Sequence, residues 1–364
     1  MNLLDFRDPW TARAVAEAIA ARSTRPVRLM EFCGGHTHAI LRFGIPDLLP
    51  PTVELLSGPG CPVCVTSAAD LIRAIALAGV PGVILTTFGD MMRVPADRGR
   101  SLARARAEGA DVRIVYSPLD ALEVARQNPA RTVVFLGVGF ETTAPMVASA
   151  VLSAEAEGIR NFAVFSTHKL TPPAMKAILD AGEVRLSGVI GPGHVTTIIG
   201  PEAWRFLPQE YGVPCAVAGF EPLDILRAIL ALVGMLETGQ PDVANAYSRS
   251  VRAGGNLAAL EAMGRVFEVA EAEWRGLGVL PASGLRIREE YAHYDAARVF
   301  PVEVLSAPEP PGCRCGDVLR GALRPVECPL FARVCTPQNP VGPCMVSAEG
   351  ACAAYYQYGR QIPY

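Results

Sequence analysis

The chain has 364 residues, of which 50% are hydrophobic, and this is enough to bury one large core or two to three ordinary ones. Its formal net charge of -3 gives no overall basic field, so we expect no nucleic-acid partner. The N-terminal segment is amphipathic and interrupted by charges, unlike a signal peptide, and no run of roughly eighteen uncharged apolar residues occurs. We therefore expect no membrane span and a cytoplasmic location.

Short apolar strands alternate with helices along the first two thirds of the chain. Helical periodicity covers 9–22, 67–77 and 118–127. Strands are predicted at 27–32, 53–56, 82–86, 112–116, 132–137, 162–166, 187–190 and 215–218. This alternation predicts α/β units with parallel sheets.

Similar glycine-rich turns follow strands in both halves of this region, so we interpret 25–127 and 128–228 as two similar parallel-sheet α/β domains. Further helices are predicted over 222–237, 241–253 and 256–270, and the periodicity is lost from about residue 276. The prediction is a third, mainly helical and irregular domain that combines 1–24 with 229–364.

Six of the ten cysteines lie after residue 312, on a segment rich in glycine and proline. Four of them follow the pattern Cys315-x12-Cys328-x6-Cys335-x16-Cys352. Soft thiolates gathered on irregular chain are typical of an iron–sulfur cluster or a zinc site. Structural zinc sites usually contain a close Cys-x2-Cys pair, which these four lack, so the spacing favours a cluster. Cys313 and Cys344 are left over as alternative ligands.

A second group of cysteines lies near the front of the chain. Cys61 and Cys64 form a Cys-Pro-Val-Cys pair just before a predicted helix, whose N-terminal dipole lowers thiol pKa values. The pair is predicted to be a redox dithiol or two thiolate ligands, since clustered cysteines in the cytosol are rarely structural disulfides.

Cys33 lies in the turn Cys-Gly-Gly-His-Thr-His that follows the first predicted strand. Open parallel sheets bind ligands at the carboxyl ends of their strands, so its thiol should project into a site. His36 in the same turn is a candidate ligand, proton carrier or hydrogen-bond donor. Glu141 follows another strand, and if the two domains face each other, it should line one cleft with Cys33, Cys61 and Cys64.

Six ordered motifs resemble the HypD family of [NiFe]-hydrogenase maturation factors over nearly the whole chain. They are Glu31–His38 (EFCGGHTH), Gly58–Cys64 (GPGCPVC), Gly137–Thr143 (GVGFETT), Thr167–Leu170 (THKL), Gly191–Val195 (GPGHV) and the tail, with Pro343–Ser347 (PCMVS) and Glu349–Cys352 (EGAC). The resemblance implies a redox-active scaffold for building the Fe(CN)2CO group, and it leaves open whether the protein turns over as an oxidoreductase.

The resemblance also implies partners. The scaffold would act with a HypC-like small chaperone and receive cyanide from a HypE-like donor, which a HypF-like carbamoyltransferase supplies. The finished iron group would then move to the hydrogenase large-subunit precursor.

The residues that match the family's motifs receive roles from the resemblance alone. Cys33 would hold the iron of the transient Fe(CN)2CO group together with a thiolate of the chaperone, and Cys61 and Cys64 would be the redox dithiol. His36 and Glu141 would support this site or handle protons. The ligands of a [4Fe–4S] cluster would be Cys315, Cys328, Cys335 and Cys352.

Two other functions stay open on the residues themselves. The first is an iron–sulfur disulfide reductase that cleaves the Cys61–Cys64 disulfide for a small substrate. The second is a zinc-stabilised interaction protein in which the tail cysteines bind one zinc ion.

Overall fold

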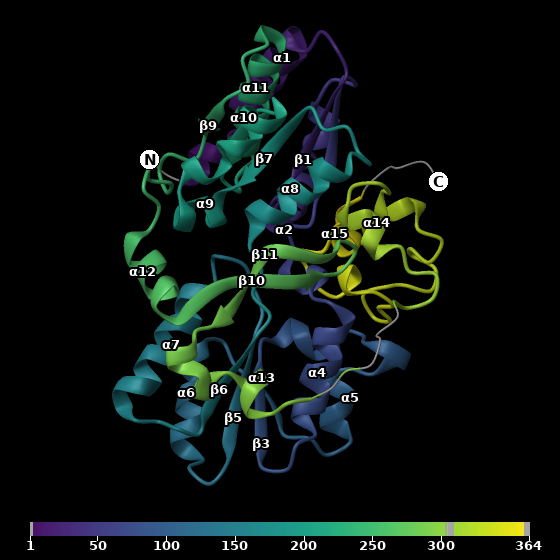
Figure 1. The fold of residues 1–364 in the computed structure, drawn as a ribbon. Helices are drawn as coiled ribbons and strands as arrows, with labels where there is room; N and C mark the ends of the chain where they lie inside the picture. The colour runs from purple at the N-terminus through teal and green to yellow at the C-terminus, as the bar shows by residue number, and fades with distance from the viewer. Residues whose placement is uncertain (1–2, 303, 305–308, 360–364) are drawn as a thin grey trace.

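The computed structural model describes residues 3–302, 304 and 309–359. The predicted α/β class is confirmed, because two parallel sheets lie one above the other with helices packed around each (Figure 1). Within the described residues, no helix is both long and apolar enough to cross a membrane.

The first sheet contains five strands, all paired in parallel. Their order across the sheet is β2 (Val53–Ser57), β1 (Val27–Glu31), β7 (Gly188–Pro192), β8 (Cys215–Ala218) and β9 (Val243–Asn245). The second sheet contains four strands, also parallel, in the order β4 (Val112–Ile114), β3 (Val83–Thr87), β5 (Thr132–Gly137) and β6 (Phe162–Ser166). Their near-continuous apolar sequences suit strands that are covered on both faces.

The predicted boundary between the two α/β domains at residue 127 is wrong, because the two sheets do not separate there. β1 and β2 pair with β7, β8 and β9, whereas β3 to β6 form the other sheet. The chain leaves the first sheet after β2, completes the second sheet, and then returns to the first. An apolar run predicts a buried strand but does not say which sheet it joins, because parallel crossovers look alike in sequence.

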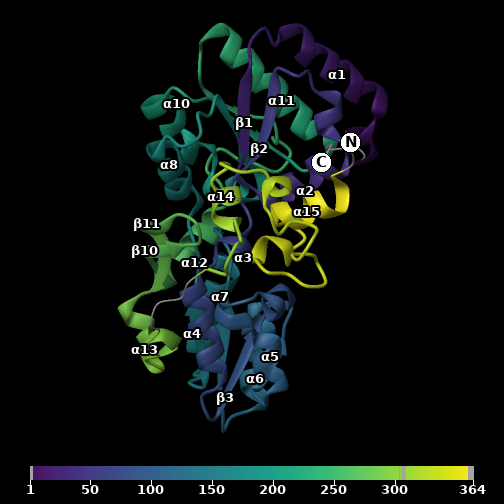
Figure 2. The ribbon, with the colours of Figure 1, turned by 90° about the vertical axis from the view of Figure 1, so that its right-hand side faces the viewer.

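Helices cover the faces of both sheets. Those around the first sheet are α1 (Pro9–Arg22), α2 (Gly34–Arg42), α9 (Gly193–Ile199), α10 (Phe206–Tyr211) and α11 (Pro222–Thr238). The helix α8 (Thr171–Ala181) lies beside α10 on the same side (Figure 2). Those around the second sheet are α4 (Ala68–Ala78), α5 (Leu102–Ala107), α6 (Pro118–Gln127) and α7 (Ala144–Glu157), and the short α3 (Pro62–Val65) lies between the sheets. Short 3-10 helices are η1 (Leu3–Arg7), η2 (Ile45–Leu48), η3 (Gly89–Arg93), η4 (Asp97–Gly99) and η5 (Pro201–Trp204).

Two predicted helices have the expected bounds because side chains cap them. Asp8 accepts the backbone N–H of Thr11 at 2.7 Å at the start of α1. Ser117 and Asp120 form a reciprocal capping box at the start of α6, with Pro118 in its first turn.

The region after α11 differs from the prediction of two further helices. The segment 241–253 contains the edge strand β9, and 256–270 contains α12 (Leu257–Val266) followed by a strand. That strand, β10 (Phe267–Trp274), pairs in antiparallel fashion with β11 (Gly278–Ile287), where periodicity was expected to end. β10 alternates between more and less buried residues, the period of a strand rather than of a helix.

The hairpin and the cysteine-rich tail fill the space between the two sheets (Figures 1 and 2). The remaining elements are η6 (Glu289–Tyr294), α13 (Ala296–Val299), α14 (Cys315–Leu319), η7 (Pro325–Glu327), η8 (Pro343–Met345) and α15 (Ala351–Tyr358). One continuous hydrophobic core runs from Leu56 of the first sheet to Val134 of the second, and it includes Cys64, Trp274 and Cys315. The front and tail cysteines are therefore parts of the same core.

Candidate functional site

Cys33 lies two residues after the end of β1 and caps the N-terminus of α2, at the carboxyl edge of the first sheet. The loop before the Cys61–Cys64 pair lies directly against it: a Cβ built on Gly60 would be 2.2 Å from the backbone nitrogen of Cys33. The N–H of Gly34 also donates to the carbonyl of Gly60 at 2.9 Å. Glycine at position 60 thus brings the two cysteine-containing turns together at one edge of the first sheet.

Cys33 is a half-buried residue with a free thiol, and its surroundings disfavour the thiolate. Burial raises its pKa to about 12, and the carboxylates of Glu349 and Glu31 act in the same direction. The backbone N–H groups of Gly35 and His36, in the first turn of α2, oppose this rise. Cys33 is therefore a thiol at neutral pH until a cation compensates the charge of its thiolate.

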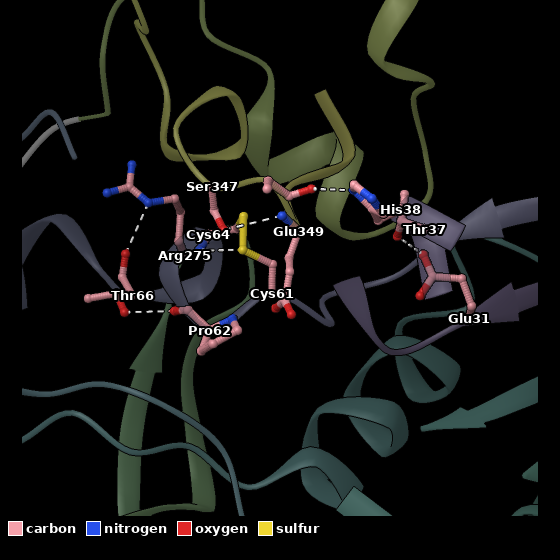
Figure 3. Close-up of a disulfide and its surroundings, with 11 residues drawn as sticks. Glu31, Thr37, His38, Cys61, Pro62, Cys64, Thr66, Arg275, Ser347 and Glu349 are labelled. Carbon is pink, nitrogen blue, oxygen red and sulfur yellow. Dashed lines mark hydrogen bonds between the residues drawn. A yellow bond between two sulfur atoms is a disulfide. The ribbon is translucent and has the colours of Figure 1, made fainter. Parts of the chain in front are cut away.

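The carboxylate of Glu31 holds the backbone of Cys33, a contact that the sequence did not predict. One carboxylate oxygen accepts the backbone N–H of Cys33 at 2.7 Å. The other accepts the hydroxyl of Thr37, as Figure 3 shows. Burial raises the pKa of Glu31 to about 7, although these hydrogen bonds lower it. The available signal was an acidic residue at the end of a buried strand, since a buried carboxyl needs partners.

His36 is fully buried in the first turn of α2. Its Nε2 lies 3.2 Å from the carbonyl of Ala218 and 3.0 Å from that of Gly219, so this nitrogen carries the proton and donates. Burial lowers the pKa of His36 to about 4, which keeps the ring neutral. Its ring stacks on that of Phe220 with the centroids 4.7 Å apart, and the ring of the exposed His194 also contacts Phe220, with the centroids 4.0 Å apart. The histidine thus ties α2 to the end of β8.

Cys61 and Cys64 are joined by a disulfide, and both are buried at the start of α3. The N–H of Cys64 points at the sulfur of Cys61 over 3.2 Å, the helix-start geometry that the spacing predicted. Figure 3 shows the disulfide with Glu349 of the tail near it and with Arg275 and Thr66 at the end of α3.

The tail cysteines line one small cavity among apolar side chains. Its lining includes Cys313, Cys315, Cys328, Cys335 and Cys352, together with Val318, Leu330, Phe331 and Met345. The structure thus brings the four predicted ligands together. Of the two alternatives, Cys313 also faces the cavity, whereas the fully buried Cys344 is not part of its lining. Thiols among apolar side chains suit a soft metal group rather than a hard cation.

The tail also contacts the Cys33 turn. A Cβ built on Gly34 would be 2.4 Å from the carbonyl oxygen of Glu349, so α2 and the tail loop approach backbone to backbone. His38 Nδ1 lies 3.3 Å from the carbonyl of Ala348. The tail loop at Ala348 and Glu349, a few residues before Cys352, therefore connects the cysteine-lined cavity to the Cys33 turn.

Glu141 belongs to the other sheet, where it follows β5. Its carboxylate accepts the N–H of Thr171 at 2.8 Å and the hydroxyl of the same residue at 2.9 Å, at the start of α8. Burial raises its pKa to about 7. These contacts place Glu141 at the start of a helix rather than at the turn that carries Cys33.

Comparison with known proteins agrees with this arrangement. The HypD profile, described as the hydrogenase formation hypA family, matches residues 10–359. The chain belongs to the HypD family. It is 55% identical to the hydrogenase maturation factor HypD of Azotobacter vinelandii, over 98% of this chain and 96% of that protein. It is 47% identical to HypD of Cupriavidus necator over the same shares, and 45% identical to HypD of Escherichia coli over 96% and 94%.

As a HypD-family protein the chain is a hydrogenase maturation factor, and the resemblance read from its motifs is confirmed. The structure explains why two HypD motifs contain glycine. Besides Gly60, Gly193 leaves no space for a side chain, because a Cβ there would be 2.2 Å from the carbonyl oxygen of Ala218. Gly60 lets its turn pack on the Cys33 turn, and Gly193 lets the turn after β7 pack on the end of β8.

Proposed function

We propose that this chain is a redox-active scaffold on which the Fe(CN)2CO group is built, with a HypC-like small chaperone as its partner. The observation that carries the proposal is the placement of Cys33. It is a half-buried residue with a free thiol at the carboxyl edge of a parallel sheet, in direct contact with the turn that leads to a disulfide.

Cys33 is the proposed anchor for the iron, which is cargo that passes through the site. Because its pKa is raised to about 12, the thiol releases its proton when the iron binds, and metal binding and proton release are coupled. Glu31 fixes the backbone of Cys33, and His36 fixes the helix that follows. A thiolate is a suitable soft ligand for iron, and a thiolate of the chaperone would complete the site.

Cys61 and Cys64 are the proposed redox pair. Reduction of their disulfide takes up two electrons and two protons, breaks the sulfur–sulfur bond and leaves two thiols next to the iron anchor. Proton handling by Glu141 is proposed from the family resemblance, because its observed contacts are with Thr171.

A [4Fe–4S] cluster is proposed for the cavity lined by the tail cysteines, with Cys315, Cys328, Cys335 and Cys352 as ligands. Such a cluster would supply electrons singly. The four cysteines line one cavity among apolar side chains, which suits a soft metal group. Their spacing also lacks the close Cys-x2-Cys pair that is usual in structural zinc sites.

The other partners follow from the same proposal. A HypE-like protein would deliver the cyanide that a HypF-like carbamoyltransferase prepares, and the completed iron group would leave for the hydrogenase large-subunit precursor. These steps rest on the family membership.

The test is an infrared spectrum of the protein purified anaerobically with its HypC-like partner. We expect bands of metal-bound cyanide and carbon monoxide in the wild type but not in Cys33→Ala. The control is Cys215→Ala, which changes a buried cysteine of β8 and should keep the bands. The tail chromophore should survive in Cys33→Ala. A wild type with a visible cluster and no such bands would reject the scaffold role in favour of the disulfide reductase. A colourless protein with one zinc per chain would reject the cluster.

A further inference from the structure

The turn of the β10–β11 hairpin is attached to the end of the disulfide helix. Thr66, the residue after α3, pairs with Trp274 through an isolated β-bridge. The backbone N–H of Arg275 donates to the carbonyl of Val65 at 2.9 Å, and its Nε donates to the carbonyl of Thr66 at 3.1 Å (Figure 3). The turn is therefore bound within two residues of Cys64.

The same turn packs on the helix that begins with Cys315. A Cβ built on Gly276 would be 2.6 Å from the Cα of Gly316, and Gly276 has a φ of +80° that favours glycine. Arg320, at the end of α14, donates to the carbonyl of Gly276 at 2.8 Å. One turn of three residues therefore lies between the disulfide helix and the cysteine-lined cavity.

Arg275 carries a positive charge into this buried place. Its side chain is 1% exposed, and the carboxylate that contacts it belongs to Glu309, which is 48% exposed. Its Nη2 has no hydrogen-bond partner among the described residues. A buried guanidinium that is only partly paired is unfavourable unless another anion compensates it.

The thiols of the cysteine-lined cavity, once deprotonated, are anions that could compensate the charge of Arg275. Gly276 follows Arg275 directly and packs on Gly316, the residue after Cys315. A Cβ built on Gly342 would be 2.6 Å from the sulfur atoms of Cys313 and Cys315, so these two thiols face the same packed space. The turn that contains Arg275 therefore lies against the start of the cysteine-rich segment.

We propose that Arg275 is a positioning residue that supplies the buried positive charge for the tail thiolates and fixes them relative to the Cys61–Cys64 helix. This inference rests on the proposed function, in which those thiolates hold an iron–sulfur cluster. Reduction adds negative charge to such a group, and a nearby buried cation favours the reduced state. Arg275 therefore raises the reduction potential of whatever group the tail cysteines hold.

The experiment compares Arg275→Gln and Arg275→Lys with Arg286→Gln in the full-length protein, purified anaerobically. Arg286 is the matched control, because it lies on β11 of the same hairpin and is exposed beside Glu268. The readouts are iron and sulfide content and a redox titration followed by visible absorbance. For Arg275→Gln we expect the equilibrium constant of one-electron reduction to fall about tenfold, a shift of about 59 mV to more negative potential.

Arg275→Lys keeps the charge and should retain most of the wild-type potential, and Arg286→Gln should match the wild type. Glu309→Gln removes the carboxylate beside Arg275 without changing the buried turn, and it should shift the potential in the positive direction. This variant keeps the test decisive if Arg275→Gln does not fold. Unchanged potentials in both Arg275→Gln and Glu309→Gln, with full iron content, would overturn the role proposed for Arg275 and leave the proposed cluster standing. A wild type without iron or sulfide would instead overturn the proposed cluster.

Discussion

The contact between Gly60 and the Cys33 turn leads to a quantitative prediction for Gly60→Ala. A methyl group at position 60 would lie 2.2 Å from the nitrogen of Cys33, 2.4 Å from its Cα and 2.5 Å from the carbonyl carbon of Phe32. All three are backbone atoms, so no side-chain rotation relieves the overlap. The two turns must separate by about an ångström or more, which weakens the hydrogen bond from Gly34 to Gly60.

The cost can be worked out from these contacts. Overpacking a close contact costs about 1–3 kcal/mol, and losing a backbone hydrogen bond costs about 1 kcal/mol. We expect Gly60→Ala to lower the free energy of unfolding by about 2–4 kcal/mol. Separation of the turns should also expose the Cys33 thiol, so that it reacts faster with an alkylating reagent.

Gly264→Ala is the matched control. Gly264 lies inside α12, and a Cβ built there meets nothing within 4 Å. This variant should be more stable than the wild type by about 0.5–1 kcal/mol, because alanine is the better helix former. Urea unfolding of both variants, with alkylation of Cys33 followed by mass spectrometry, is the assay. A Gly60→Ala protein with wild-type stability and wild-type Cys33 reactivity would refute the close approach of the two turns.

Three further outcomes are expected. Burial raises the pKa of Glu141 from 4.5 to about 7, so its contribution to stability is complete below about pH 4.5 and is lost as the pH rises through 7. In urea unfolding, the free energy of unfolding of the wild type should fall by up to about 3 kcal/mol over this range, whereas that of Glu141→Gln should not. Parallel pH profiles of the two proteins would contradict this. Cys328→Ala should bleach the visible absorbance of the anaerobic protein while Cys215→Ala keeps it, and an unchanged spectrum in the first variant would exclude Cys328 as a ligand. Phe220→Leu removes the ring that contacts His36 and should lower stability by about 1–2 kcal/mol in urea unfolding, whereas an unaltered unfolding midpoint would show that this stacking contributes little.

The sequence predicted local elements well wherever local physics decides them. The strands at 162–166 and 215–218 have the predicted bounds, because each is a short apolar run that ends in a turn. The helix at 9–22 was equally clear, because Asp8 and Pro9 mark its start. Four of the tail cysteines, Cys315, Cys328, Cys335 and Cys352, were expected to share one site, and these four line one cavity.

Features that depend on distant partners were not predictable in the same way. The segment Phe267–Trp274 contains alanine and glutamate, which favour helices, but pairing with β11 makes it a strand. The contact of Glu31 with the Cys33 backbone, and the position of Arg275 between two cysteine groups, arise only when the chain is folded. The same holds for Glu141, because nothing near it in sequence indicates that its carboxylate would bind the start of α8.

The order of strands in the first sheet has a consequence for biosynthesis. β1 carries Cys33 at its end, yet its neighbour β7 begins about 160 residues later, after the whole second sheet. On the ribosome, the turn around Cys33 cannot take its final shape until β7 and β8 have emerged, because Phe220 and the carbonyls that hold His36 follow them. If Cys33 is the iron anchor proposed above, loading must therefore follow synthesis of most of the chain.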